Sequence, residues 1–150
     1  MIKRIAENRR ARHDYFIEER FEAGIELFGT EVKSIRLGEV NLKDSFCAVR
    51  GGELYVQGMH VSPYRQGGIF NREPLRPRRL LMHRREINRL MARVKQDGFA
   101  LIPICVYLKG PRVKLEIALC RGKKLYDKRA AQEERQVKRS LDRIVKERHL

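Results

Sequence analysis

The chain has 150 residues, of which 42% are hydrophobic and 35% charged, and it carries a formal net charge of +15. This length suits one domain with a hydrophobic core, and no apolar run approaches the roughly 18 residues that span a bilayer, since residues 99–108 are interrupted by Pro103. The strong positive charge favours a polyanionic partner, with nucleic acid ahead of an anionic membrane surface; a generic basic surface is the alternative.

The amino terminus and the cysteines indicate where the protein acts. Residues 1–13 are predicted to form a basic N-terminal arm, and this segment lacks the apolar region of a secretory signal. Cys47, Cys105 and Cys120 are odd in number, far apart and surrounded by strand-like sequence. We interpret them as reduced core residues, not as disulfides or zinc ligands. We therefore expect a soluble, cytoplasmic protein.

The first predicted strand begins at Tyr15. Apolar residues occupy the odd positions of residues 21–27 and polar residues lie between most of them, which is typical of a half-buried strand. A short helix is predicted over residues 28–38, with Thr30 as its N-cap and Gly38 at its end.

Two glycines at positions 51 and 52 predict a β-hairpin, because the strand-like residues 46–50 and 53–61 flank them. Residues 62–80 contain three prolines and two adjacent glycines, so they predict a long loop.

The clearest helix contains Ile87, Leu90, Met91 and Val94 at positions i, i+3, i+4 and i+7, and Gly98 is its predicted end. A second hairpin pairs residues 99–108 with the strand that follows residues 109–111. Its first strand is apolar on both faces and is expected at the centre of the sheet. Its second strand alternates, with four residues predicted to face the core: Val113, Leu115, Ile117 and Leu119.

These elements predict a mainly β, α+β fold. We expect residues 14–122 to form a closed antiparallel OB-like β-barrel with about three short helices, because closure removes exposed strand edges. A flat sheet with helices on one face is the alternative. Residues 123–150 form a basic C-terminal tail with a narrow apolar seam, so we expect it to be disordered when free and helical when bound. A helix packed against the barrel is the alternative for this tail.

Motifs for catalysis and metal binding are missing from the sequence. The four histidines have no catalytic spacing, no phosphate-binding glycine motif is present, and no Cys or His pair has ligand spacing. We predict that the chain is not an enzyme and has no metal or cofactor site. The remaining signal is basic residues interleaved with aromatic or apolar ones, in the N-terminal arm, residues 76–86 and residues 121–129. Such clusters favour RNA through counterion release and base stacking.

Four stretches are more specific: NRRARHDYFIEERFEAG from residue 8, GTEVKSIRLGEVNLKDSF from residue 29, RPRRLLMHRREI from residue 76 and GKKLYDKR from residue 122. In order and spacing they resemble the bacterial SsrA-binding protein family, also called small protein B. The resemblance implies an OB-like barrel that binds the tRNA-like domain of transfer-messenger RNA (tmRNA) and delivers it to stalled ribosomes in trans-translation. The alternatives are a general single-stranded RNA-binding OB protein of the initiation or cold-shock type, and a metal-independent ribonuclease.

The resemblance also implies site residues. Asn8 and His13 would bond base edges or 2′-hydroxyls, Glu22 would accept bonds from base amines, and the cations would contact phosphates. The full predicted RNA-binding set is Asn8, Arg10, Arg12, His13, Glu22, Lys33, Arg78, Arg79, Leu81, His83, Lys123 and Lys124.

The tail is expected to enter the vacant mRNA channel of the small ribosomal subunit and to become helical there. Its residues near the decoding centre would be Tyr126, Asp127, Lys128 and Arg129. The expected partners are tmRNA, the ribosome with its small-subunit rRNA, and elongation factor Tu with alanyl-tmRNA. The protein itself is expected to be a monomer.

Overall fold

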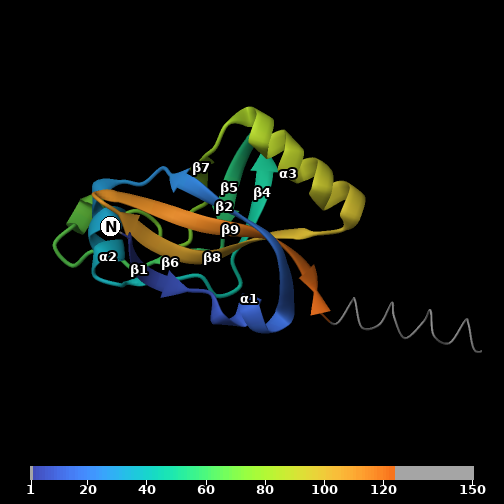
Figure 1. Ribbon diagram of the computed structural model, residues 1–150. Helices are drawn as coiled ribbons and strands as arrows, with labels where there is room; N and C mark the ends of the chain where they lie inside the picture. Colours follow the sequence, from blue (N-terminus) through green and yellow to red (C-terminus); the bar gives the residue numbers. More distant parts are fainter. Residues whose placement is uncertain (1, 124–150) are drawn as a thin grey trace, which may run out of the picture.

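The computed structural model of the chain describes residues 2–123 (Figure 1). The predictions made for Lys124 and for residues 126–129 lie outside this range. The described elements, in chain order, are β1 (Ile2–Glu7), α1 (Arg9–Asp14), β2 (Tyr15–Ile25), α2 (Gly29–Arg36), β3 (Val40–Asn41), β4 (Phe46–Arg50), β5 (Glu53–Gln57), β6 (His60–Val61), the 3-10 helix η1 (Gly68–Phe70), β7 (Arg78–Leu81), α3 (Arg84–Asp97), β8 (Ala100–Lys109) and β9 (Arg112–Gly122).

Seven strands form one antiparallel sheet in the order β1-β8-β9-β2-β7-β5-β4, and β3 pairs separately with β6. The prediction of an α+β fold with three α-helices is confirmed. The prediction of a closed barrel is wrong, because β1 and β4 are the two edges of the sheet and no ladder between described residues joins them.

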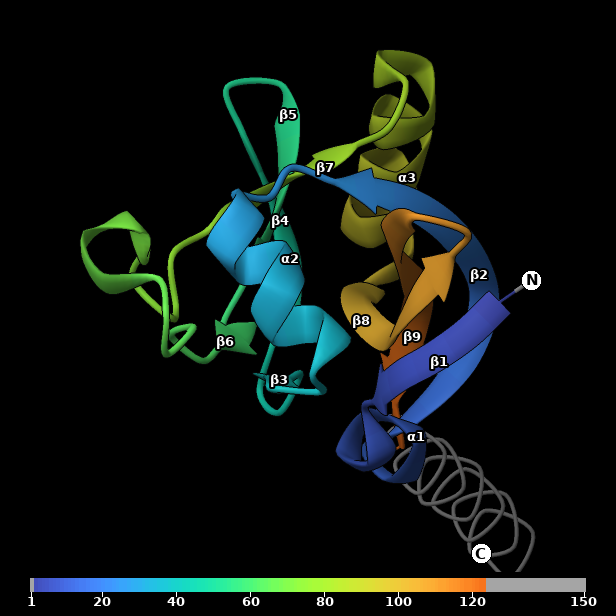
Figure 2. The same ribbon diagram turned by 90° about the vertical axis from the view of Figure 1, so that its left-hand side faces the viewer.

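The short strand β7 joins the two parts of the open sheet. It pairs with β2 through Leu80 and Leu81, and with β5 through Arg78 and Arg79. By contrast, β2 pairs with β9 from Tyr15 to Gly24. The sheet therefore has two parts, β1-β8-β9-β2 and β7-β5-β4, which meet at the end of β2 (Figure 2). Both edge strands are short, which limits the need for closure.

The core confirms the predicted inward face of β9, since Val113, Leu115, Ile117 and Leu119 are all buried in the main hydrophobic cluster. The strand β8 is buried on both faces, as predicted, because a second, smaller cluster lies on its other side. There Ala11 of α1 packs with residues of β8 and β9, so α1 covers that face.

The helix α3 confirms its predicted pattern and its predicted end. Ile87 and Leu90 are buried, and Gly98 caps the helix with φ of 68°, in the left-handed region that glycine adopts without strain. The predicted N-cap of α2 is wrong. Thr30 lies inside α2, and the N-cap is Phe28, whose backbone N–H donates to the Glu31 carboxylate at 2.9 Å. This bond satisfies one of the free N–H groups at the start of the helix.

The loop predicted over residues 62–80 is present, but its last three residues belong to β7. Cys47, Cys105 and Cys120 are buried free thiols, as predicted. No helix among residues 2–123 is long and apolar enough to cross a membrane.

Candidate nucleic-acid interface

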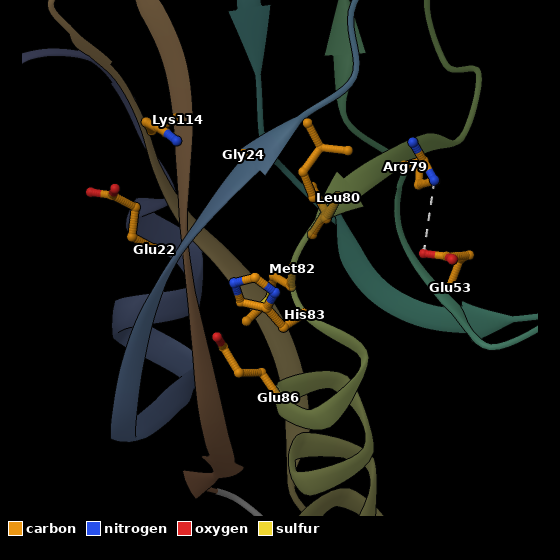
Figure 3. A pocket seen from close by; sticks show the side chains of 10 residues that line it. Glu22, Gly24, Glu53, Arg79, Leu80, Met82, His83, Glu86 and Lys114 are labelled. Atoms are coloured by element: carbon orange, nitrogen blue, oxygen red, sulfur yellow. Dashed lines mark ion pairs between the residues drawn. The ribbon is translucent and has the colours of Figure 1, made fainter.

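An open hollow of about 520 Å³ lies where the pairing of β2 with β7 ends and α3 begins (Figure 3). We call it the β2–β7 hollow. It brings together four predicted site residues that are far apart in the sequence: Glu22, Arg79, Leu81 and His83. The other residues that line it are Gly24, Glu53, Leu80, Met82, Glu86 and Lys114.

The backbone geometry at the end of β7 exposes two of these side chains. Gly24 pairs with Leu81, and a Cβ atom on Gly24 would lie 3.1 Å from the Leu81 Cβ, so glycine permits this close approach. Leu81 is 50% exposed although Leu80 beside it is fully buried. His83 is exposed at the N-cap of α3, where its ring makes no capping bond. An apolar side chain and an imidazole therefore both face solvent at this point.

Glu22 is one of three acidic residues that line the hollow, and its carboxylate is held from two sides. The Tyr107 hydroxyl donates to Oε2, and the Lys109 Nζ lies 3.3 Å from Oε1. The hydrogen bond from Tyr107 is the main cause that lowers the pKa of Glu22; burial acts in the opposite direction, and Lys109 and Lys114 lower the pKa further. Glu22 is thus an ionised acceptor on a cationic protein.

A second hollow of about 320 Å³ lies on the outer face of β1, β8, β9 and β2 and shares Glu22 with the first. We call it the arginine hollow, because Arg4, Arg12 and Arg20 line it. Each arginine is close to an acid: Arg4 is 3.0 Å and Arg12 is 3.9 Å from Glu7, and Arg20 is 3.2 Å from Glu116. The predicted residue Arg12 therefore lies near Glu22, on the same side of the sheet.

Arg10 and His13, the other predicted residues of α1, line neither of these two hollows. Arg10 lies 3.5 Å from Asp14 and 3.6 Å from Asp44, and it lines a hollow of about 470 Å³. His13 is exposed, with Nδ1 2.9 Å from the Asp14 carboxylate.

Asn8 is buried, and its side chain is used inside the protein. Its Nδ2 donates to the carbonyls of Leu42 at 3.2 Å and Pro103 at 3.0 Å, while Oδ1 accepts the N–H of Ala11 at 3.1 Å. Both amide hydrogens are therefore occupied. Asn8 caps α1 and ties it to β8, and no donor remains for a base in this conformation.

Arg78 is fully buried, so it does not reach a phosphate in this conformation. Its guanidinium donates to the Glu31 carboxylate at 2.6 Å, to the Met59 carbonyl at 2.7 Å and to the Pro74 carbonyl at 3.0 Å. Arg76 donates to the same carboxylate. The pair of Arg78 and Glu31 thus fastens the loop before β7 onto α2, which is a structural task.

The two remaining described residues of the predicted set lie outside these three hollows. Lys33 is exposed on α2, with its Nζ 5.4 Å from the centroid of the Tyr64 ring. Lys123 has its Nζ 5.2 Å from the centroid of the Phe16 ring. Both are cation–π contacts.

The sequence matches the family described as SmpB protein over residues 5–147. The chain belongs to the SmpB family. Among SmpB relatives, the SsrA-binding protein of Clostridium botulinum (strain Hall) is 58% identical over 144 residues, which are 96% of this chain and 92% of the relative. That of Clostridium perfringens (strain 13) is 57% identical over 147 residues, 98% of this chain and 94% of the relative. The resemblance predicted from the sequence is thus confirmed.

A solved structure described as "tmRNA-SmpB: a journey to the center of the bacterial ribosome" has the same fold. It is 45% identical to this chain, with a TM-score of 0.68, and the alignment covers 81% of this chain and 85% of that one. The SmpB fold thus extends over most of the described residues.

Lys114 lines the β2–β7 hollow but was not among the residues predicted from the sequence. It lies on β9 opposite Gly24, on the strand next to Glu22 (Figure 3). The alternation of β9 was a usable signal, because inward Val113 and Leu115 place Lys114 on the outer face. The pairing of β9 with β2, which brings Lys114 to Glu22, was not visible in the sequence.

The electrostatic field of the SmpB body is positive, since residues 1–123 contain 25 Lys and Arg against 14 Asp and Glu. The β2–β7 hollow itself is mixed: Lys114, Arg79 and His83 lie close to Glu22, Glu53 and Glu86. A mixed set of donors and acceptors suits base edges, which present both. Within residues 2–123 no group of three His, Cys, Asp or Glu side chains could hold a metal ion.

Proposed function

We propose that this chain binds the tRNA-like domain of tmRNA and delivers it to stalled ribosomes in trans-translation. The observation that carries the proposal is membership of the SmpB family, with curated relatives called SsrA-binding proteins. The β2–β7 hollow supports it, because it offers Glu22, Leu81, His83 and Lys114 together on a strongly basic body.

The side chains of the hollow have different tasks in this proposal. Glu22 and His83 bond base edges or ribose hydroxyls, and Leu81 packs against a base. Lys114 in the β2–β7 hollow and Arg12 in the arginine hollow contact phosphates and supply affinity by counterion release. His13, Arg10, Arg79, Lys33 and Lys123 are further proposed contacts on the same basis, whereas buried Arg78 and Asn8 are left out.

The tail belongs to the ribosomal step of the proposal. Residues 123–150 follow the RNA-binding body of residues 14–122 and occupy the vacant mRNA channel, with Tyr126, Asp127, Lys128 and Arg129 near the decoding centre. The basic composition of this segment suits a channel walled by rRNA. In this role the protein acts in the cytoplasm as a monomer without catalytic activity of its own, and elongation factor Tu meets it through alanyl-tmRNA.

A gel-shift comparison tests the first step. The chain should bind an RNA with the tRNA-like fold more tightly than an unpaired RNA of equal length at the same salt concentration. Equal or stronger binding of the unpaired RNA would instead favour a general single-stranded RNA-binding protein. Intact RNA after the incubation would argue against ribonuclease activity.

Two variants make the comparison sharper. Lys114→Met should weaken binding and make the plot of log affinity against log salt shallower by roughly 0.7–0.9, which corresponds to one lost phosphate contact. Lys95→Met, on the exposed side of α3, is the matched control and should leave both unchanged.

A deletion tests the ribosomal step. Removal of residues 130–150 should leave binding to the tRNA-like RNA nearly intact and abolish peptide tagging on stalled ribosomes. Equal loss of both activities would refute the division between body and tail.

A further inference from the structure

Tyr107 has an unusual position for a buried tyrosine. It lies on β8 and is 6% exposed, yet its hydroxyl donates to the partly exposed Glu22 carboxylate on β2. The strand β9 lies between these two strands in the sheet. A tyrosine on one strand therefore fixes a carboxylate two strands away, at the boundary shared by the β2–β7 hollow and the arginine hollow.

We propose that Tyr107 is a positioning residue for RNA recognition, which holds the Glu22 carboxylate in one orientation so that its free electron pairs face a base or ribose donor. This inference rests on the proposed function and adds to it a residue that itself makes no contact with RNA.

The surroundings of Glu22 explain why such a tether matters. A glutamate side chain has several rotatable bonds, and ordering them at the moment of binding reduces affinity. Lys109 and Lys114 also attract the carboxylate, so without Tyr107 its orientation would depend on these two lysines. Besides Tyr107, the charged and titratable groups that pair with Glu22 or line the two hollows with it are Lys109 and Cys105 on β8, Lys114 and Glu116 on β9, Arg20 on β2, Arg4 on β1, Arg12 on α1, Glu53 on β5, Arg79 on β7, and His83 and Glu86 at the start of α3.

The ionisation of the pair agrees with this geometry. The hydrogen bond from Tyr107 is the main cause of the lowered pKa of Glu22. In turn, burial and the bond to Glu22 raise the pKa of Tyr107, so the phenol remains a donor at any physiological pH. Loss of the hydroxyl should let the pKa of Glu22 rise toward its ordinary value, although Lys109 and Lys114 still hold it down in part.

The first experiment uses the free protein. Carboxyl carbon NMR titration of Glu22 in the wild type and in Tyr107→Phe measures its pKa directly, with thermal unfolding to confirm that the variant is folded. We expect the pKa to rise in Tyr107→Phe and to stay unchanged in Tyr55→Phe. Tyr55 is the matched control, because its hydroxyl makes no hydrogen bond with the described residues and it lines none of the three hollows. An unchanged Glu22 pKa in Tyr107→Phe would overturn the proposal.

A reciprocal measurement covers the case that Tyr107→Phe does not fold. The Glu22→Ala variant removes the carboxylate that accepts the hydrogen bond of Tyr107, and Glu22 is the more exposed residue of the pair. The ring Cζ resonance of Tyr107 should therefore shift, while that of Tyr55 should not. A Tyr107 resonance that stayed in place would overturn the proposal as well.

The second experiment measures affinity for the tRNA-like RNA in a double-mutant cycle. Tyr107→Phe should weaken binding about five- to tenfold without changing its salt dependence, as expected for the loss of one intramolecular hydrogen bond. In a Glu22→Gln background the same change should cost less than twofold, because Tyr107 acts through the carboxylate. An equal loss in both backgrounds would show that Tyr107 acts independently of Glu22, and it would refute the inference.

The two experiments also separate this inference from the proposed function. If the wild type did not bind the tRNA-like RNA, the function would be wrong while the pKa measurement still reported the coupling of Tyr107 with Glu22. If the wild type bound and the cycle was additive, the function would stand and the positioning role would fall.

Discussion

Replacement of Arg78 by methionine should destabilise the fold strongly and affect RNA affinity only through folding. The variant keeps most of the buried volume but removes the guanidinium that donates to Glu31, Met59 and Pro74. Glu31 is itself 4% exposed, so its carboxylate would be left in the interior with Arg76 as its remaining charged partner. The two carbonyl groups would lose a buried donor as well.

The expected magnitude follows from the burial of this pair. Removal of one partner from a buried ion pair costs about 3–5 kcal/mol, and the remaining contact with Arg76 favours the lower end, about 3 kcal/mol. With a urea m-value of about 1.5 kcal/mol per molar, the unfolding midpoint should fall by about 2 M. Urea unfolding followed by far-ultraviolet circular dichroism measures this shift, since the chain contains no tryptophan.

Arg85→Met is the matched control, because Arg85 is an exposed arginine near the start of α3. It should change the free energy of unfolding by less than about 0.5 kcal/mol. A loss below about 1 kcal/mol in Arg78→Met, the range of surface ion pairs, would refute the structural role assigned to this arginine. If folded Arg78→Met bound RNA with a shallower salt dependence than the wild type, this would instead support the predicted phosphate contact of Arg78.

Three further results are expected. Burial raises the pKa of Glu31, but hydrogen bonds from two arginines and a backbone N–H outweigh this effect and lower the pKa below 4.5. The stability that Glu31 contributes should therefore be lost as pH falls below about 4.5, and a Glu31→Gln variant that lost as much stability in acid as the wild type, measured by urea titration, would contradict this. Leu81→Ala should weaken RNA binding without changing its salt dependence, since the leucine is uncharged and 50% exposed, and an altered slope in gel shifts would be contrary. Burial raises the pKa of Cys47, and raises that of Cys120 to about 11, so both thiols should react slowly with a disulfide reagent until the protein is unfolded; rapid modification of the native protein would be inconsistent with their burial.

Elements with strong local patterns were predictable from the sequence. The helix α3 has its apolar residues at helical spacing and ends at Gly98, and the β8–β9 hairpin has one uniformly apolar and one alternating strand. These signals depend on neighbours within a few residues. The open form of the sheet depends instead on pairings between distant segments, such as those of β7 with β2 and β5 over two residues each, and no local pattern reveals them.

The candidate site was predictable only in part, and that part came from the family resemblance. Glu22, Leu81 and His83 come together as expected from the resemblance, and the structure adds Lys114 from a strand whose partner was unknown. Charge alone was a poor guide to exposure. Arg78 is an arginine among other basic residues, which is typical of a side chain that contacts phosphate, yet it is fully buried.

The alternation within β7 connects that buried arginine to the RNA-binding surface. Arg78 and Leu80 face inward, so Arg79 and Leu81 face outward, and a shift of one residue would exchange the two pairs. Two ladder pairs on each side specify this register weakly. The hydrogen bonds of Arg78 disfavour a shift in one direction, because Pro77 in its place would leave the Glu31 carboxylate and two carbonyls without this buried donor. The buried ion pair thus helps to keep Arg79 and Leu81 on the outer side of β7, and this role in the interior accounts for a fully buried arginine in a basic strand.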